Sequence, residues 1–447
     1  MYSLCGGRRP GTTRSIRRVP ALPSPPARGA PDACPGAVQL HPAADGLLAR
    51  IRCPGGLLTA VQLRLLAAVA RDHGDGHLEL TSRANVQVRA VAVAATGPLA
   101  ARLRTAGLLP STAHERVRNI LGSALADIDT PAAWDVGAQV RALDAAICAE
   151  PDLARLSGRF LFAIDDGRGD TVAARADVGL LPGPDDEVTV LLAGADHGLR
   201  ARPADAVRVA VAAARAFLDD PDAAAGSAWR LDDLTPAALD RVVIRAGTAP
   251  GVRRTARRWQ PLTPAGGPVA PVGVRHRPDG DFALVVAVPL GRLTVDQVDL
   301  LAAASPQLRI TPWRGVVLPR VTDPAGWADR LTRAGLVTDP DSPWLGVTAC
   351  AGLPGCARSR ADVRADAAAT HAGRPAPTGG VPAPGRRHRL PVHWIGCERG
   401  CGSPAGPMVR VTATGDGYQI DAPDRTSIRL PTGAALGAAV QTAREEQ

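Results

Sequence analysis

An internal duplication is the feature that most limits how this chain can fold. Residues 45–59 read DGLLARIRCPGGLLT, and residues 281–294 read DFALVVAVPLGRLT. Each copy runs into a helix that opens on the same pattern, Thr59 with Gln62 and Thr294 with Gln297, which predicts two capping boxes. Matching strands are expected at 78–91 and 308–321. One copy is too small to bury a core alone, so we expect the two to pair about a pseudo-twofold axis.

The segments between and after the copies divide the chain further. We expect a disordered leader at 1–30, the first copy at 31–109, a domain at 110–248, a linker at 249–272, the second copy at 273–338 and a last domain at 339–447. In the 110–248 domain the patterns predict strands at 159–164, 172–178 and 188–192, and helices at 138–148 and 204–217.

Four of the eight cysteines form two pairs near the C-terminus. Five residues separate Cys350 from Cys356, forty separate that pair from the next, and three separate Cys397 from Cys401. This spacing fits neither a zinc finger nor a redox Cys-x-x-Cys, and it favours an iron–sulfur cluster, with zinc or incidental thiols as alternatives. Cys356 precedes an expected helix at 357–369, whose N-terminus would stabilise a thiolate. Cys34 has no assigned role.

Composition excludes several functions. All 52 basic residues are arginine, the net charge is +9, and aromatic residues make up 3%. Nucleic-acid binding therefore has little support, and any anion site must use guanidinium groups. No apolar run is long enough for a membrane span and no export signal is complete, so we expect a cytoplasmic protein. Without a Gly-x-Gly-x-x-Gly fingerprint, electrons are expected from ferredoxin or a separate NAD(P)H-dependent reductase.

Residues 81–87, TSRANVQ, are expected to form a strand. Period-two alternation would then place Arg83, Asn85 and Gln87 on one face, as a polar ligand surface or simply a solvent-facing strand.

Cys-x5-Cys followed by Cys-x3-Cys at the end of a duplicated chain resembles the sulfite and nitrite reductase superfamily. The resemblance implies an α+β fold of two ferredoxin-like half domains paired by pseudo-twofold symmetry, each followed by a sulfite/nitrite-reductase-type α/β domain. It implies a [4Fe–4S] cluster on Cys350, Cys356, Cys397 and Cys401. It also implies that the tetrapyrrole carboxylates are bound by a set of polar residues, namely Arg83, Asn85, Gln87, Arg118, Asn119 and Arg314.

Departures from the reductase pattern favour one branch of the superfamily. Where sulfite reductases carry two lysines, this chain has Arg159, expected to be catalytic, and Leu161, which carries no charge. Cys-Pro-Gly at Cys34, Arg-x-Pro-Gly-Gly at Arg52 and Thr-Pro-Trp-Arg at 311–314 resemble the precorrin-3B synthase branch.

That branch implies a monooxygenase of aerobic cobalamin biosynthesis. Its substrates are a precorrin tetrapyrrole and molecular oxygen, and it hydroxylates precorrin-3A with γ-lactone formation while the cluster delivers electrons. A mononuclear non-haem iron would take ligands from His41, His114, His371, His388 or His393. The alternatives are a sirohaem-dependent assimilatory sulfite or nitrite reductase, and a non-enzymatic tetrapyrrole-binding metalloprotein.

Overall fold

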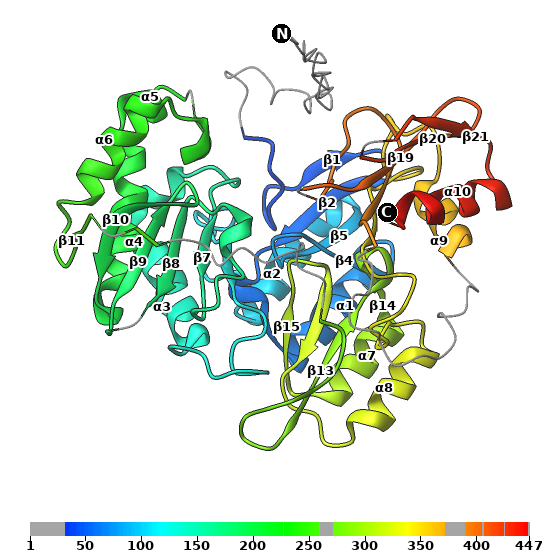
Figure 1. Cartoon of the computed structure of the whole chain (residues 1–447), viewed down its shortest axis with the longest axis horizontal. Coiled ribbons are helices and arrows are strands. Elements are labelled where there is room, and N and C mark those ends of the chain that lie inside the picture. Colours follow the sequence, from blue (N-terminus) through cyan, green and yellow to red (C-terminus); the bar gives the residue numbers. More distant parts are fainter. Residues whose placement is uncertain are drawn as a thin grey trace, which may run out of the picture.

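The computed structural model describes residues 32–445 except 184, 227, 257, 260–270, 372–388, 405 and 424. The predicted leader, most of the predicted linker after residue 259, Cys5 and His388 lie outside the described residues. Four parts are visible: two half domains at the centre, a first α/β domain on one side and a cysteine-bearing domain on the other (Figure 1). No helix among the described residues is long and apolar enough to cross a membrane.

The two half domains repeat one order of elements. The first contains β1 (His41–Ala43), β2 (Gly46–Ile51), β3 (Leu57–Thr59), α1 (Ala60–His73), β4 (His77–Leu80), β5 (Val86–Val91) and α2 (Thr96–Thr105). The second contains β12 (Gly273–His276), β13 (Phe282–Ala287), β14 (Arg292–Thr294), α7 (Val295–Ala304), β15 (Gln307–Ile310), β16 (Gly315–Leu318) and α8 (Pro324–Arg333).

Each half domain lends one strand to the sheet of the other. The sheets run β1-β2-β5-β4-β14 and β12-β13-β16-β15-β3, so β14 completes the first and β3 completes the second. Leu78 pairs with Leu293, and Leu308 pairs with Leu58. This reciprocal exchange confirms the predicted pairing about a pseudo-twofold axis.

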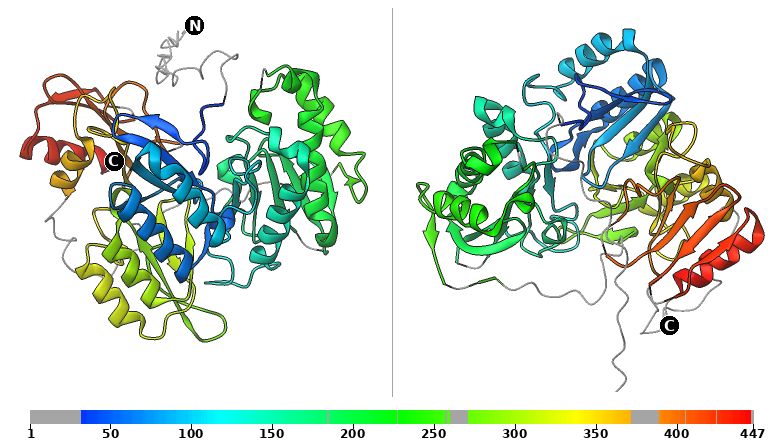
Figure 2. Two further views of the ribbon diagram at one scale, coloured as in Figure 1. Left: turned by 180° about the vertical axis from the view of Figure 1, so that it is seen from behind. Right: turned by 90° about the horizontal axis from the view of Figure 1, so that it is seen from above.

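Both predicted capping boxes are present. The Thr59 hydroxyl accepts from Gln62 N, and the Gln62 side chain accepts from Thr59 N; Thr294 and Gln297 do the same for α7. Helices α1, α2, α7 and α8 lie side by side over one face of the sheets (Figure 2). A single hydrophobic core joins both halves, because Leu63 and Leu66 of α1 are buried in the same cluster as Leu301 of α7.

The two α/β domains also share a topology. In the first domain, β6 (Ile120–Gly122), β7 (Phe162–Ile164) and β8 (Val178–Pro182) are parallel, and β9 (Val188–Leu192), β10 (Ala195–Ala201) and β11 (Arg253–Arg254) continue the sheet antiparallel. Its helices are α3 (Val136–Ala149), α4 (Pro203–Leu218), α5 (Pro221–Ala224) and α6 (Pro236–Ala246).

The other domain, called here the cysteine domain, follows the same plan. Strands β17 (Val347–Ala349), β18 (Val392–Ile395) and β19 (Val409–Ala413) are parallel, and β20 (Tyr418–Asp421) and β21 (Ile428–Leu430) are antiparallel. Helices α9 (Val363–His371) and α10 (Ala434–Arg444) pack against it.

Some local predictions differ from the structure. The strand expected at 172–178 is wrong, since Val172–Ala174 form a single turn and β8 begins at Val178. The chain turns at Arg175, where φ is 45°, and this turn lets the Asp177 carboxylate accept from the backbone N–H groups of Leu161 and Leu231. The segment expected to be a linker begins inside the sheet, because Arg253–Arg254 form β11.

Candidate functional site

The four clustered thiols lie at the carboxyl ends of two neighbouring parallel strands. Cys350 follows β17 directly, and Cys397 comes two residues after β18. The two strand ends are tied together, because Cys350 N donates to Trp394 O (2.9 Å) and Gly396 N donates to Cys350 Sγ (3.2 Å).

The two cysteine pairs lie within electrostatic reach of each other. Burial raises the pKa of the Cys401 thiol, and the neighbouring thiols of Cys350, Cys397 and Cys356 raise it further. All four are free thiols. Four thiols close enough to repel one another as thiolates, on loops that direct an N–H at a sulfur, suit a metal cluster better than isolated core cysteines do.

The expected helix directly after Cys356 is wrong. Helix α9 begins at Val363, and residues 357–362 turn instead. Asp362 supplies the reason, because its carboxylate accepts from Ala365 N and so caps the helix at that point. The helix dipole therefore does not start at Cys356.

Arginines from three parts of the molecule hold the cysteine loops by their carbonyl groups. Arg364 Nε of α9 donates to Cys350 O (3.2 Å), and Arg89 Nη2 of β5 donates to Gly355 O (2.6 Å). Arg314 Nη2 of the second half domain donates to Gly402 O (3.1 Å). The loops are thus fixed by side chains of both half domains.

His393 supports the second pair. Its Nε2 lies 3.0 Å from Cys401 O and its Nδ1 lies 2.8 Å from Thr348 Oγ1. Burial lowers the pKa of His393 to about 4. The neutral ring therefore donates from Nε2 to the cysteine carbonyl and accepts the threonine hydroxyl at Nδ1.

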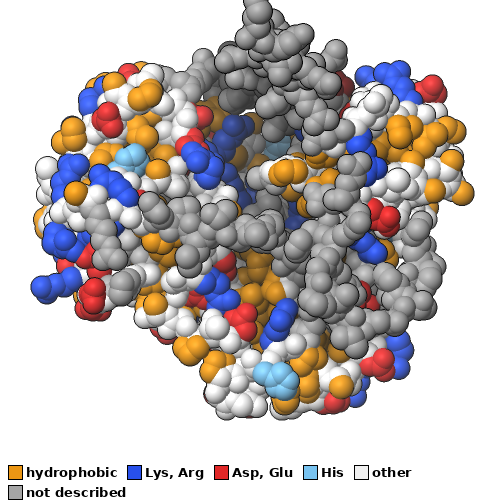
Figure 3. All heavy atoms as spheres, viewed as in Figure 1, with side chains coloured by type: hydrophobic (Ala, Val, Ile, Leu, Met, Phe, Trp, Pro, Cys, Tyr) orange, Lys and Arg blue, Asp and Glu red, His pale blue; other side chains and the backbone are white. Residues whose placement is uncertain are grey.

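A second feature is a group of guanidinium groups that we call the arginine cluster, made of Arg50, Arg52, Arg83 and Arg230. Burial and the charge of Arg50 together lower the pKa of Arg52 to about 9. Burial and the charge of Arg230 lower the pKa of Arg83 to about 10. Figure 3 shows arginine side chains gathered in a hollow between the first α/β domain and the first half domain.

The arginine cluster is not neutralised by the protein. Arg52 is 2% exposed, yet its Nη1 has no hydrogen-bond partner among the described residues. Arg83 makes no ion pair in the described part of the chain. Arg230 is paired with Asp177 (3.0 Å). Arg52 Nε and Nη2 donate to Arg116 O (3.1 Å) and Gly158 O (3.5 Å), so only Nη1 is left over. A buried charged donor without a partner is costly, so this arrangement suits an anion. Cys34 lies within the cluster, close to Arg50 and Arg52.

The polar row predicted on residues 81–87 does not exist as a strand face. Residues 81–85 form a turn, in which Ala84 has φ 54° and the Thr81 hydroxyl accepts from Asn85 N (3.0 Å), and β5 begins at Val86. Arg83 therefore does not share a strand face with Asn85 and Gln87.

Three of the other predicted ligands have partners inside the protein. Asn85 accepts from Cys53 N (2.9 Å) and donates to Asn119 Oδ1 (3.1 Å), and Asn119 donates to Gly158 O (2.6 Å). Arg118 is bound by both carboxylate oxygens of Asp144, each at 2.7 Å. The geometry thus gives these three residues structural roles, in contrast to the ligand roles that the resemblance implies.

The remaining predicted residues lie in varied settings. Gln87 accepts from Arg50, and Arg314 stands in a turn with φ 60°, at the position equivalent to Ala84. The Arg159 guanidinium stacks on the Trp229 ring at 4.2 Å. Leu161 is buried in the half-domain core, so the uncharged residue does not face a polar site.

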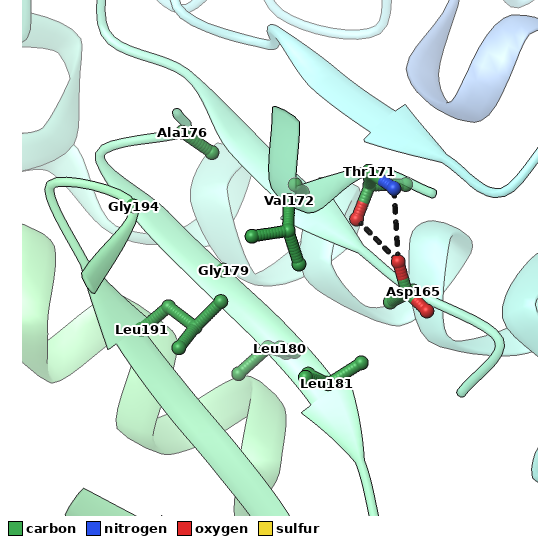
Figure 4. Close-up of a pocket in the computed structure, with 10 residues that line it drawn as sticks. Asp165, Thr171, Val172, Ala176, Gly179, Leu180, Leu181, Leu191 and Gly194 are labelled. Atoms are coloured by element: carbon green, nitrogen blue, oxygen red, sulfur yellow. Dashed lines mark hydrogen bonds between the residues drawn. The ribbon is translucent and has the colours of Figure 1, made fainter. Parts of the chain in front are cut away.

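Among the described residues, the carboxylates of Asp165, Asp166 and Asp170 are the one group of three or more possible ligands close enough together to share a single metal ion, and the four thiols are spaced more widely than that. Asp165 already accepts from Thr171 N and Oγ1, beside a small aliphatic pocket (Figure 4), and Asp166 is paired with Arg168 (2.8 Å). His114, offered above as an iron ligand, contacts Ser111 and Glu150 O with its two nitrogens.

Comparison with known proteins relates this chain to one class of enzymes. Residues 41–106 and 275–324 match the nitrite/sulfite reductase ferredoxin-like half domain. The ferredoxin–nitrite reductase of Leptolyngbya laminosa is 32% identical over 153 residues, covering 32% of this chain and 30% of that protein. The enzyme of the same name from Synechococcus elongatus is 26% identical over 403 residues, covering 80% and 74%. The two matched segments are thus similar to the half domains of the nitrite/sulfite reductases, and the longest match extends the similarity over most of the chain.

The fold agrees. The Mycobacterium tuberculosis NirA protein superposes with a TM-score of 0.65 at 21% identity, covering 87% of this chain and 76% of that one. The precorrin-3B synthase interpretation is overturned, because the matching relatives are named as nitrite reductases. The oxygen and precorrin substrates and the monooxygenase activity that were expected from the sequence are therefore not supported either.

Sequence reasoning missed several residues of the site. These are Arg50, Arg230, Arg89, Arg364 and Glu79. Four of them, Arg50, Glu79, Arg89 and Arg364, share one signal, a charged residue within a strand or helix that is otherwise largely apolar, whereas Arg230 lies in a turn and gives no such signal.

Proposed function

We propose that this chain is an oxidoreductase that reduces nitrite with electrons from ferredoxin. The observation that carries the proposal is a group of four free thiols within electrostatic reach of one another, in a chain that also buries an arginine cluster with an unpartnered donor. The relatives' names supply the substrate and the donor.

The residues present fit the two cofactors of such an enzyme. Cys350, Cys356, Cys397 and Cys401 would hold a [4Fe–4S] cluster, since all four are free thiols within electrostatic reach of Cys401 and Gly396 N donates to one sulfur. The unpartnered Nη1 of Arg52 fits a carboxylate of sirohaem. When bound, the two cofactors supply electrons and an iron that binds the oxyanion.

The side chains of this protein would bind and orient the substrate and the tetrapyrrole. Arg83, with no carboxylate partner in the described structure, offers a charged donor to nitrite or to a tetrapyrrole carboxylate. Arg159 provides a fixed positive charge against Trp229, but arginine does not give up its proton in proteins. Protons for the reaction are therefore expected from solvent rather than from Arg159.

Steady-state kinetics test the proposal. Anaerobically purified holoenzyme with reduced ferredoxin is expected to consume nitrite. Arg83→Gln removes a charged hydrogen bond of about 1.5–3 kcal/mol, which predicts a loss in kcat/KM of roughly 10- to 100-fold.

Arg104→Gln, at an exposed position near the end of α2, is the matched control and is expected to leave the kinetics unchanged. Fully loaded enzyme that reduces sulfite and leaves nitrite untouched would show that the substrate is wrong.

A further inference from the structure

Glu79 of β4 occupies the junction between the thiol cage and the arginine cluster. It is 6% exposed. Arg364 Nη1 lies 2.6 Å from its Oε1, and Gln87 Nε2 donates to its Oε2 (3.2 Å). Glu79 and Arg364 are 285 positions apart in sequence, so this ion pair joins the first half domain to the cysteine domain.

The two partners of Glu79 contact different sites. Arg364 also donates to the carbonyl of Cys350, one of the four thiol residues (3.2 Å). Gln87 accepts from Nε of Arg50 (2.8 Å), a member of the arginine cluster. A continuous row of side chains, Arg364, Glu79, Gln87 and Arg50, therefore connects the cage to the anion site.

Glu79 also acts on more distant cations. Its negative charge opposes the lowering of the pKa that burial imposes on Arg50 and Arg314, and it favours the charged form of Arg89. Arg89 and Arg314 hold the two cysteine loops by their carbonyl groups. Glu79 is thus the carboxylate that the three loop-holding arginines share.

The pseudo-twofold axis shows that the fold does not require a carboxylate here. Leu78 and Leu308 are equivalent, so Glu79 corresponds to Arg309 in the second half domain. Arg309 Nη1 binds the carbonyl of Ala126 directly (2.6 Å), in the loop after β6. On the cysteine side, the equivalent position has the opposite charge and contacts the loop through Arg364.

We propose that Glu79 is a positioning residue that lowers the reduction potential of the cluster held by the four cysteines. The inference rests on the proposed function, which assigns that cluster. Reduction adds negative charge, and the Arg364 guanidinium at the Cys350 carbonyl favours it. Glu79 offsets this cation in a buried setting, where charges are weakly screened.

Redox titration followed by electron paramagnetic resonance tests the inference on the anaerobically purified holoenzyme. Glu79→Gln keeps the shape and removes the charge, so the midpoint potential is expected to become more positive. Arg364→Gln leaves Glu79 uncompensated, so its midpoint potential is expected to become more negative. Glu79→Asp retains the charge and is expected to stay near the wild-type value.

Glu398→Gln is the matched control. Glu398 follows Cys397 directly, but its side chain is 75% exposed and is screened by water. We expect it to shift the potential less than Glu79→Gln does.

Unchanged potentials in Glu79→Gln and Arg364→Gln, or a control shift as large as theirs, would overturn the inference. Iron and sulfide content distinguishes failure of the proposed function from failure of this inference alone. A wild-type protein without a cluster defeats the proposed function as well, whereas a full cluster with an unshifted potential defeats this inference alone. The two variants test one effect with opposite signs, so a folding defect in either leaves the other informative.

Discussion

Arg118 and Asp144 form an ion pair in which one edge of the guanidinium group binds both carboxylate oxygens. Nε and Nη2 bind the two carboxylate oxygens, and Nη1 donates to Leu108 O (3.1 Å). The Arg118 side chain is 4% exposed. Each nitrogen of the Arg118 guanidinium therefore already has a partner inside the protein, whereas the Arg83 guanidinium has no carboxylate partner in the described structure.

We predict that Arg118→Gln lowers the free energy of unfolding by about 3–5 kcal/mol, because it leaves the Asp144 carboxylate without its cation. Urea titration measures this loss. The double variant Arg118→Leu with Asp144→Leu is expected to recover much of the stability. A KM for nitrite raised as strongly as in Arg83→Gln, at unchanged stability, would show that Arg118 is a ligand after all.

The exchanged strands β3 and β14 make the two half domains one cooperative element. Leu58 and Leu293 are both buried in the shared core, each in a strand that completes the other half's sheet. If one half domain unfolds, the sheet of the other half domain loses its edge strand.

Leu58→Ala and Leu293→Ala are each expected to cost about 2–5 kcal/mol, the usual range for a large-to-small change in a core. In both variants, hydrogen exchange should accelerate in β4 and in β15 alike. Val61→Ala, at a position 74% exposed on α1, is the control and should change little. Faster exchange confined to one half would contradict cooperative pairing.

At the scale of elements, the sequence predicted much of this arrangement. The repeated Thr-x-x-Gln boxes, the strand at 188–192 and helices α3 and α4 follow from local patterns and are confirmed. Two predictions were wrong because of local hydrogen bonds. Thr81 stabilises a turn where alternation predicted a strand, and Asp362 caps α9 so that the helix begins later than expected.

The candidate site was predictable only in part. Cysteine spacing alone singled out the four thiols, which lie within electrostatic reach of one another, and their binding of a cluster stays a prediction. The partner of Arg118 was not predictable, because Arg118 lies in the loop before β6 and Asp144 reaches it from helix α3, 26 positions away. The row from Arg364 to Arg50 exists only in three dimensions.

Over the whole molecule, the cysteine loops are the place where the parts meet. Arg89 holds one loop from the first half domain, and Arg314 holds the other from the second. A cluster bound by all four cysteines would link the ends of β17 and β18 and strengthen these contacts.

We therefore predict that removing the cluster with chelator under oxidising conditions destabilises the cysteine domain selectively, since ligand binding to the native state adds to its stability. Amide hydrogen exchange should accelerate in β17 and β18, whereas β8 and β9 of the first α/β domain should retain their protection. Equal acceleration in both domains would show that the cluster has no local structural role.

The most direct test of the account is the cofactor content of anaerobically purified protein. Iron and acid-labile sulfide are measured together with sirohaem extracted in acidified acetone, for the wild type and for Cys401→Ser. We predict about four sulfides with iron for the cluster and one sirohaem per chain, with the sulfide lost in the variant. Zinc in place of iron and sulfide, with no tetrapyrrole, would contradict the central claim.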